Sequence, residues 1–406
     1  MILRWQEQEI RRALSSRRGV HLTGARQCGK TTLAEYISAG GMRHVSLDKQ
    51  MYLRSAKEEP ESFVERPDGK TLVIDEIQKA PELLDAIKVE LDHCNNKGQY
   101  LLTGSSNLRF MKSVKDSLAG RLKTVRLRTF SLGEIRGTKG DFIERAFAKD
   151  FPSGDEENFG RRAIIEYAFK SGYPEARELE PYDRRGWFED YLKDLLVKDI
   201  KDITEIRKIS SLRKVAEWML AYTSKFFEMN DLCAQAHISK ATADNYLDAL
   251  KSLYVVDELE PWSKSDYAKI GKRSKYYASD PGLVANILGW NEEHAFYDSD
   301  MAGKLVETLV YHELSVLIER SQQYTMTQYR DSDKREIDFV SERDDGATLG
   351  VEVKAGNASS DDFKHLKWFA SHFAVGEFIG IVLYSGKDVL SFGKDMYAVP
   401  IAMLGV

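Results

Sequence analysis

A glycine-rich segment near the N-terminus constrains the fold of this chain more than any other feature. It reads Gly24-Ala-Arg-Gln-Cys-Gly-Lys-Thr31 and follows the apolar run Val20-His-Leu22. The spacing is that of a phosphate-binding loop, G-x-x-x-x-G-K-[ST], which joins a strand to a helix. In such a loop the backbone N–H groups turn toward phosphates, the lysine contacts the β- and γ-phosphates, and the threonine hydroxyl reaches Mg²⁺. The segment therefore predicts a nucleoside triphosphate site within an α/β domain.

We expect ATP and Mg²⁺ as the ligands of this loop. Residues 32–38 are predicted to form the helix whose N-terminal dipole faces the phosphates. Lys30 would contact the phosphates and Thr31 the metal. A glycine-rich turn without a ligand is the alternative. The residues predicted to bind the nucleotide are Gly24, Ala25, Arg26, Gln27, Cys28, Gly29, Lys30, Thr31 and Thr32.

Two acids follow a second apolar run. The segment Thr71-Leu-Val-Ile-Asp75-Glu76 is typical of a buried parallel strand that carries carboxylates to its C-terminal end. Open α/β sheets bind their ligands at that end. Asp75 is predicted to hold the Mg²⁺ shell, and Glu76 to orient and polarise the water that attacks the γ-phosphate. The alternative is that these acids only cap the next helix.

Further segments of the first 128 residues alternate between strand and helix patterns. Alternation of this kind favours a largely parallel sheet. Ser105 follows one of these strands, at the position where ATPases of the AAA type place a residue that senses the γ-phosphate. The predicted strands cover residues 44–48, 99–104 and 123–128, and the predicted helices between them cover 81–91 and 107–118.

A basic cluster spans the end of this region, and such a cluster needs an anionic neighbour. Arg121 is the candidate for an arginine that meets the triphosphate, either within its own chain or from a neighbouring subunit. A solvated basic helix and edge strand is the alternative. The cluster consists of Arg109, Lys112, Lys115, Arg121, Lys123, Arg126 and Arg128, with Asp116 as the one acid among them.

Composition limits the remaining classes of protein. The chain has 406 residues, enough for two or three domains, and no apolar run approaches the roughly 18 residues of a membrane span. Its first residues carry charges where a signal peptide needs apolar ones, so we expect a cytoplasmic protein with no membrane partner. Three dispersed cysteines fit a reducing compartment. Because the net charge is -5, nucleic acid would have to bind at local basic patches.

The middle of the chain contains a predicted linker and a helix-turn-helix pattern. Residues 139–158 are expected to be the linker, and helical patterns dominate from 161 to 203. Residues 229–236 and 240–252 are predicted to be the two helices, with Ser239 as N-cap of the second. The wing strands that follow are joined by a loop whose basic residues could neutralise DNA phosphates. These residues are Lys264, Lys269, Lys272, Arg273 and Lys275.

Three interpretations of this module remain open. It could read bases specifically, contact nucleic acid without sequence preference, or serve only as an architectural winged helix. Asp244 and Asp248 lie on the exposed side of the second helix and count against DNA reading, because phosphates repel carboxylates.

The last third of the chain contains a second candidate site. Glu307 shares a helical face with apolar residues, Asp338 lies in one predicted strand, and Glu352 and Lys354 project from one side of another. This set looks like the metal centre of restriction-type nucleases, in which carboxylates hold Mg²⁺ and a lysine stabilises phosphate charge. The alternative is an ion-pair network in which Lys354 neutralises the acids and no nucleic acid is cut.

Taken together, these motifs resemble a family of prokaryotic AAA-type ATPases whose C-terminal half is a domain of unknown function with a restriction-endonuclease-like core. The resemblance covers nearly the whole chain and implies an architecture more firmly than a biological task. Cys28 departs from the pattern, because relatives often carry an aliphatic residue there, and a thiol could make nucleotide binding sensitive to modification. The motifs lie at 24–33, 73–81, 102–106, 118–121, 131–134, 172–174, 280–283, 335–338 and 351–354, together with Glu307.

The resemblance implies an ATPase that couples its nucleotide state to rearrangement of C-terminal domains on a macromolecular partner. DNA is a candidate partner, and a homo-oligomer is a candidate assembly. The alternative is an ATP-regulated, metal-dependent nuclease of a defence or toxin type. The expected α/β architecture is an AAA-type P-loop ATPase domain with a parallel sheet over 1–138, a linker and helical connector over 139–205, a winged-helix-like module over 206–269, and an α/β restriction-endonuclease-like domain over 270–406.

Overall fold

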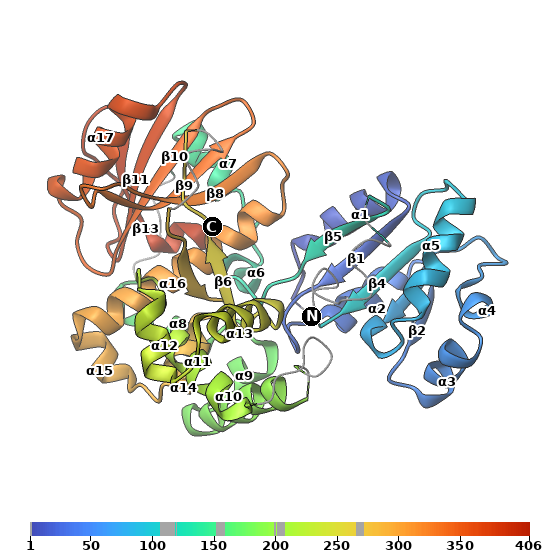
Figure 1. The fold of residues 1–406 in the computed structure, drawn as a ribbon. Coiled ribbons are helices and arrows are strands. Elements are labelled where there is room, and N and C mark those ends of the chain that lie inside the picture. The colour runs from blue at the N-terminus through green and yellow to red at the C-terminus, as the bar shows by residue number, and fades with distance from the viewer. Residues whose placement is uncertain are drawn as a thin grey trace.

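The computed structural model describes residues 2–105, 118, 120–151, 159–198, 200, 208–264 and 272–406. These residues form two lobes (Figure 1). The N-terminal domain is one lobe, and the other lobe combines a helical region with a C-terminal sheet.

The N-terminal domain is built on a parallel sheet of five strands in the order β2-β3-β4-β1-β5. Every residue of β1, β3 and β4 is buried, as is usual for parallel strands with both faces covered. The predicted parallel α/β sheet is confirmed. The helix predicted over 107–118 lies outside the described residues except for its last position. The elements of this domain are α1 (Gln6–Ser16), β1 (Gly19–Thr23), α2 (Lys30–Ser38), β2 (Arg43–Ser46), α3 (Gln50–Glu58), α4 (Pro60–Val64), β3 (Leu72–Asp75), η1 (Ile77–Lys79), α5 (Leu83–His93), β4 (Tyr100–Gly104) and β5 (Leu122–Arg126).

Part of the predicted linker is helical. Helix α7 (Phe142–Ala148) lies within the predicted linker, residues 139–158. Its aromatic side chains Phe142 and Phe147 are buried in the core, which stabilises a helix there. Residues 152–158 of the same segment lie outside the described structure. The other helices of the region after β5 are α6 (Leu132–Arg136), α8 (Arg161–Lys170), α9 (Pro174–Glu178), α10 (Pro181–Val197), α11 (Ile209–Ala221), α12 (Met229–Ala236) and α13 (Lys240–Ser252).

The two predicted helices of the helix-turn-helix pattern are present as α12 and α13. Helix α12 ends at His237, which has a left-handed backbone, and the Ser239 hydroxyl accepts a hydrogen bond from Thr242 N at 3.2 Å to cap α13. The antiparallel strands β6 (Val256–Leu259) and β7 (Lys275–Ala278) follow. Strand β7 pairs with β6 although it lies beyond residue 269, the predicted end of this module.

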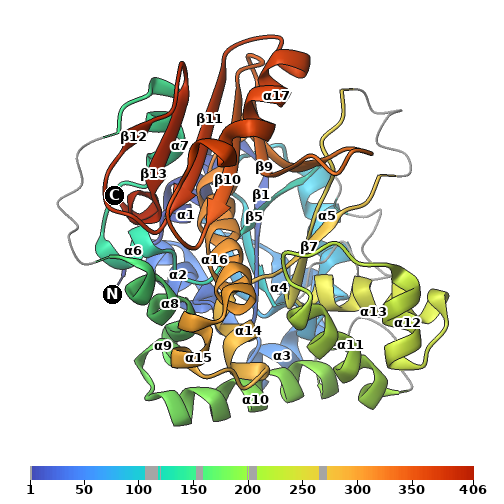
Figure 2. The same ribbon diagram turned by 90° about the vertical axis from the view of Figure 1, so that its left-hand side faces the viewer.

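Three helices after β7 connect the helical region to the C-terminal sheet. Helices α14 (Pro281–Ile287) and α15 (Glu292–Tyr297) pack against α8, and the 21-residue helix α16 (Ser299–Glu319) packs against α8, β8 and β10. Helix α16 runs through the middle of the molecule (Figure 2). Helix α8 precedes residue 270 and packs on α14, α15 and α16, which all follow it. The packing therefore places no domain boundary at residue 270.

The C-terminal sheet has six strands in the order β12-β13-β11-β10-β9-β8. Strands β10, β11 and β13 are parallel, whereas β9 is antiparallel to both of its neighbours. Helix α17 packs against β9 and β11. The elements are β8 (Tyr324–Arg330), β9 (Glu336–Arg343), β10 (Thr348–Lys354), η5 (Ser360–Phe363), α17 (Lys364–Phe373), β11 (Phe378–Tyr384), β12 (Leu390–Ser391), β13 (Met396–Pro400) and η6 (Ile401–Gly405).

Candidate functional site

The predicted phosphate-binding loop makes a tight turn between β1 and α2. Gly24 has a φ of 151° and Gly29 a φ of 101°, in the region that favours glycine. A Cβ atom on Gly24 would lie 2.1 Å from Leu127 O, so a side chain does not fit there. Gly29 directly precedes α2, whose first N–H groups have no partners within the helix. Loop and helix end therefore present N–H groups and a positive dipole to an anion.

Lys30 and Thr31 lie where the loop meets β3. Lys30 is 5% exposed, and its Nζ donates hydrogen bonds to Gly24 O at 3.0 Å and to Ala25 O at 2.7 Å. Thr31 Oγ1 donates to the Asp75 carboxylate, at 3.0 Å from Oδ1 and 3.1 Å from Oδ2. These adjacent hydroxyl and carboxylate oxygens fit a hard divalent cation such as Mg²⁺.

Asp75 ends β3 and is fully buried. Besides Thr31, it accepts hydrogen bonds from Ser46 Oγ at 3.3 Å and from Thr103 Oγ1. A buried carboxylate needs such partners to compensate for lost water. The neighbouring strands β2 and β4 supply these two hydroxyls, so the sheet itself fixes the position of the carboxylate.

Glu76 follows Asp75 with a left-handed backbone, at a φ of 61°. Its N–H donates to Thr103 Oγ1 at 3.2 Å, and Gln78 Nε2 donates to its carboxylate. In the described structure the Glu76 side chain makes no capping hydrogen bond to the helical turn that follows. Burial, reinforced by the neighbouring Asp75, raises the pKa of Glu76 above its ordinary value of 4.5, and Lys30 partly opposes this shift.

Ser105, the predicted γ-phosphate sensor, is linked to Glu76 by one side chain. Gln78 Nε2, which donates to the Glu76 carboxylate, also lies 3.1 Å from Ser105 Oγ and donates to it. Gln78 was not predicted to have a role. The sequence feature that could have indicated this role is the position of Gln78, two residues after Glu76 and at the same edge of the sheet.

A cavity of about 560 Å³ opens over the loop and over Glu76. One wall is the N-terminal segment, where Arg4 Nη1 donates to Cys28 O at 2.8 Å and Arg4 Nε pairs with Glu134 Oε1 at 3.0 Å. Another wall is α9, beginning at Pro174. Neither wall was predicted from the sequence, because neither carries a nucleotide-binding motif.

Cys28 faces the protein interior. It is fully buried, and its Sγ donates to Leu127 O at 3.4 Å. Burial keeps this thiol away from solvent and reagents, and buried structural cysteines are inert. The expected sensitivity to thiol modification is therefore not supported by this conformation.

Arg121 lies at the opposite edge of the sheet from the loop. It precedes β5, whose first residue Leu122 is aligned with Gly19 at the start of β1, whereas the loop follows the end of β1. A five-residue strand spans roughly 13–17 Å. Arg121 instead pairs with Asp92, with Nε 2.7 Å from Oδ1. This placement does not support contact between Arg121 and the triphosphate of its own chain, and a role across a subunit interface stays a prediction.

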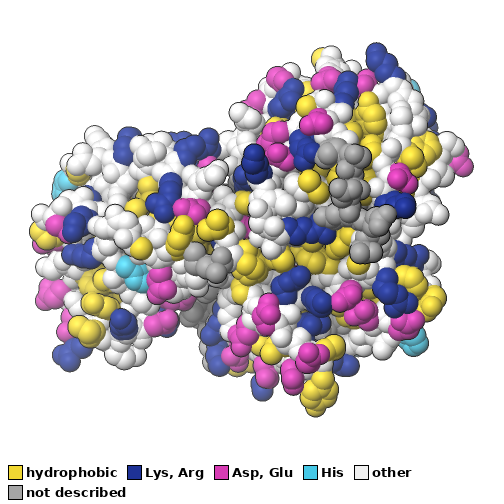
Figure 3. Space-filling view, turned by 180° about the vertical axis from the view of Figure 1, so that it is seen from behind, with side chains coloured by type: hydrophobic (Ala, Val, Ile, Leu, Met, Phe, Trp, Pro, Cys, Tyr) yellow, Lys and Arg dark blue, Asp and Glu magenta, His cyan; other side chains and the backbone are white. Residues whose placement is uncertain are grey.

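Two other arginines of the basic cluster meet acids of the second lobe. Arg126 Nη2 lies 2.8 Å from Asp257 Oδ1, and Arg128 pairs with both Asp257 Oδ2 at 2.7 Å and Glu319 Oε1 at 2.8 Å. Burial alone would raise the pKa of Asp257, but the two arginines hold it well below the ordinary value. Figure 3 shows hydrophobic and basic side chains gathered where the lobes meet. The residues of the cluster outside the described structure are Arg109, Lys112 and Lys115.

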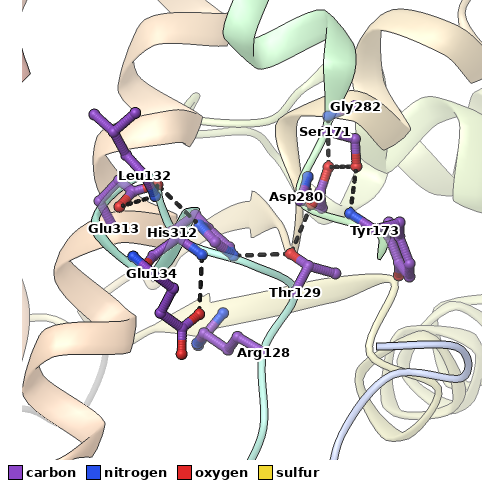
Figure 4. A network of polar contacts seen from close by, with 12 residues as sticks. Arg128, Thr129, Leu132, Glu134, Ser171, Tyr173, Asp280, Gly282, His312 and Glu313 are labelled. Carbon is purple, nitrogen blue, oxygen red and sulfur yellow. Dashed lines mark hydrogen bonds and ion pairs between the residues drawn. The ribbon is translucent and has the colours of Figure 1, made fainter. Parts of the chain in front are cut away.

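Several of the family motifs converge on a buried polar junction beside the loop (Figure 4). At its centre Thr129 Oγ1 donates to Asp280 Oδ2 at 2.7 Å and lies 2.9 Å from His312 Nε2. Asp280 also accepts hydrogen bonds from Ser171 Oγ and Gly282 N, both at 2.7 Å. The junction therefore ties the segment after β5 to α14 and α16.

A second part of the junction holds helix α6. Leu132 N donates to the Glu313 carboxylate, 3.0 Å from each oxygen. The Ser131 hydroxyl accepts from Glu134 N at 3.2 Å, while Ser131 N donates to the Glu134 carboxylate at 3.1 Å. Glu134 also holds Arg4, which contacts the phosphate-binding loop. The junction thus connects the loop to the C-terminal half through buried polar contacts.

The second predicted site is a buried group of acids around Lys275. The Nζ of this residue lies 2.7 Å from Glu307 Oε1, 2.8 Å from Glu336 Oε1 and 3.2 Å from Asp338 Oδ1. Lys275 is 2% exposed. Burial alone would lower its pKa, but Glu307 and the other acids raise it well above the ordinary value, so the ammonium stays charged. We call these four residues the Lys275 cluster.

Glu352 and Lys354 lie at the margin of this cluster. Lys354 Nζ is 3.8 Å from Glu352 Oε2 and 3.5 Å from Asp362 Oδ1. Burial, reinforced by Asp338, raises the pKa of Glu352 well above its ordinary value. The sequence-based alternative of an ion-pair network assigned the neutralising role to Lys354, whereas the structure gives it to Lys275.

The predicted metal site at Glu307, Asp338, Glu352 and Lys354 is not supported. Within the described ranges, no three His, Cys, Asp or Glu side chains are arranged to hold a metal ion. The physical reason is that the Lys275 ammonium takes the place among the carboxylates that a cation needs. The nuclease alternative stays a prediction.

Three family models match consecutive parts of the chain. An AAA domain matches residues 16–136, and two domains of unknown function, DUF8612 and DUF4143, match 161–294 and 302–404. The N-terminal domain is therefore similar to AAA domains. The second model ends within α15, in agreement with the packing of α14 and α15 on α8.

The uncharacterized protein Rv2008c of Mycobacterium tuberculosis is 24% identical over 357 residues, which cover 86% of this chain and 73% of that protein. The uncharacterized protein Mb2031c of Mycobacterium bovis gives the same values. Among solved structures, a Walker-type ATPase of Pyrococcus abyssi has a TM-score of 0.40 at 14% identity, covering 71% of this chain and 96% of that one. The AMPPCP-bound DnaA of Aquifex aeolicus has a TM-score of 0.27 at 15% identity, covering 60% and 86%.

None of the described helices combines the length and the apolar character that crossing a bilayer requires.

Proposed function

We propose that this chain binds ATP with Mg²⁺ at residues 24–32, hydrolyses the ATP, and uses its nucleotide state to rearrange the C-terminal modules on a macromolecular partner. One observation carries the proposal. Lys30, Thr31 and the half-buried Glu76 line one cavity at the C-terminal ends of parallel strands, and Thr31 donates to the buried Asp75.

The side chains divide the work of hydrolysis among them. Lys30 would exchange its carbonyl partners for phosphate oxygens, and Thr31 with Asp75 would hold Mg²⁺, which neutralises phosphate charge when bound. Glu76 would orient and polarise the attacking water. Its raised pKa makes it a stronger base than an exposed glutamate. Gln78 donates to both Ser105 and Glu76, so a phosphate that contacts Ser105 would also change the position of the Glu76 carboxylate.

Coupling to the C-terminal half is supported by two sets of contacts. The polar junction links Arg4 and the segment after β5 to α14 and α16. A direct contact lies at the other end of the loop, where Thr23, the last residue of β1, has its Oγ1 2.6 Å from the Tyr254 hydroxyl. Movement of the loop would therefore displace Tyr254, which lies between α13 and β6.

Substitution of Glu76 by glutamine tests the proposal, because the amide keeps the shape of the side chain but cannot act as a carboxylate. We expect Glu76→Gln to bind ATP and to hydrolyse it about 10²–10⁴ times more slowly, measured as phosphate release at saturating ATP. The matched control is Glu82→Gln at an exposed position, which should hydrolyse ATP at the parental rate. Parental turnover by Glu76→Gln would show that this acid has no catalytic role.

A further inference from the structure

A pocket of about 680 Å³ lies between the wing segments and the edge of the C-terminal sheet. Its walls come from Phe226 after α11, Trp262 after β6, Arg330 at the end of β8 and Phe373 at the end of α17. Next to Trp262, Pro261 forms a bridge to Gln328 of β8. The pocket is therefore built where two modules meet, and it shares no lining residue with the cavity over the phosphate-binding loop.

The described lining of this pocket is strongly basic. Asp331, its one acid, already pairs with Arg335 at 2.9 Å. Arg273 pairs with Glu228, and Lys272 Nζ donates to Trp262 O at 3.1 Å. The other three cations form no ion pair within the described residues, and cations gathered in this way attract an anion. These three are Lys264, Arg330 and Lys334.

The pocket also offers an aromatic wall and unused hydrogen-bond donors. The Arg330 guanidinium lies 4.3 Å from the centroid of the half-buried Phe226 ring. Trp262 is 7% exposed, and its Nε1 and the neighbouring Ser263 Oγ are buried atoms with no hydrogen-bond partner in the described structure. Buried donors without partners are costly. A ligand with acceptor oxygens and flat rings would satisfy both features of the pocket.

We infer that this pocket binds single-stranded nucleic acid, with phosphates on Lys264, Arg330 and Lys334 and bases against the aromatic wall. Stacking on aromatic side chains combined with a basic groove is how single strands are bound without sequence preference. A duplex is disfavoured, because a concave pocket with aromatic side chains in its wall admits unpaired bases. The inference deepens the proposed function by naming its partner, and it rests on that function only for the coupling to ATP.

The test is binding of a fluorescent 20-nucleotide thymidine strand to the full chain without ATP, followed by anisotropy at several salt concentrations. Arg330→Gln and Lys334→Glu should each weaken binding about tenfold and make the dependence of log K on log salt shallower by about 0.7. Phe226→Leu should weaken binding about tenfold without changing that slope. The control is Lys387→Glu, an exposed position after β11 near the opposite edge of the sheet, which should bind like the parent.

Three results would overturn the inference. They are parental affinity in Arg330→Gln and Lys334→Glu, tighter binding of a duplex of the same sequence, and equal competition by inorganic polyphosphate, which would indicate a plain anion site. Thermal melts identify a variant that does not fold, and Lys264→Glu then replaces it. Phosphate release from ATP is measured on the same preparations. ATP hydrolysis without strand binding removes only this inference, whereas strand binding without ATP hydrolysis removes only the ATPase function.

Discussion

The sites around Lys30 and Lys275 both contain a buried ammonium, but the two lysines touch different groups. Lys30 donates to two backbone carbonyls, so phosphate oxygens can replace these partners without leaving a charge unpaired. Lys275 lies within 3.2 Å of three carboxylates, so its departure would leave several buried charges uncompensated. The comparison teaches that a lysine held by carbonyls is available to a ligand, whereas a lysine held by acids maintains the fold.

The largest effect on stability should come from breaking the Lys275 cluster. Asp338→Ala removes a partner of Lys275 and the acceptor of the Val353 N–H. We expect it to lower the free energy of unfolding by roughly 3–5 kcal/mol in EDTA, measured by denaturant titration. The control Asp344→Ala, in an exposed turn, should stay within about 0.5 kcal/mol of the parent. Equal destabilisation by both variants would show that the cluster is not structural.

A pH series sharpens the same point. Burial and the neighbouring Asp338 raise the pKa of Glu307 to about 7, so the folded chain keeps a proton there that the unfolded chain releases near the ordinary value of 4.5. The resulting stabilisation is complete below pH 4.5 and is lost as the pH rises to about 7, by about 3 kcal/mol at most. Glu307→Gln should lose less stability than the parent over this range in denaturant titrations. An equal loss in the two proteins would contradict the assigned shift.

Arg121 gives a smaller effect that tests the nucleotide site. Because Arg121 pairs with Asp92 at the far edge of the sheet, Arg121→Ala in a monomeric preparation should bind ATP with parental affinity in a calorimetric titration. If Arg121 acts across a subunit interface, mixing Arg121→Ala with Lys30→Ala chains should restore part of the ATPase rate, because intact half-sites can then meet. Weaker ATP binding by monomeric Arg121→Ala would show that Arg121 contacts the triphosphate of its own chain.

The smallest expected effect is the response of the Lys275 cluster to metal. Without ATP, millimolar Mn²⁺ should shift the melting temperatures of the parent and of Asp338→Asn by the same amount, since the ammonium already occupies the cluster. Asp75→Asn serves as the control for metal bound near Thr31. A Mn²⁺ shift in the parent that disappears in Asp338→Asn, and not in Asp75→Asn, would restore the C-terminal metal site.

The residues of the predicted nucleotide site lie together in the structure, because each of its motifs is a contiguous segment at the end of a strand. Lys30 and Thr31 follow one strand, Asp75 and Glu76 end another, and the ends of parallel strands meet at one edge of a sheet. The Lys275 cluster was not predicted, because its cation and its acids come from three elements, β7, α16 and β9, that are separated in the sequence. One local signal existed: Lys275 and Tyr277 share a face of β7, and a lysine on the same face as a buried aromatic indicates a buried charge. Arg4 carries no comparable signal.

Calorimetric titration of ATP with Mg²⁺ into the parent and into Lys30→Ala tests most directly whether Lys30 is the lysine available to a ligand. Both proteins should melt at similar temperatures, because in the described structure Lys30 forms no ion pair and donates only to two backbone carbonyls. The parent should bind one ATP per chain, and the affinity of Lys30→Ala should be lower by about 100-fold or more, since two charge-assisted contacts to phosphate are lost. Binding of ATP by Lys30→Ala with parental affinity would contradict the assignment of this loop as the nucleotide site.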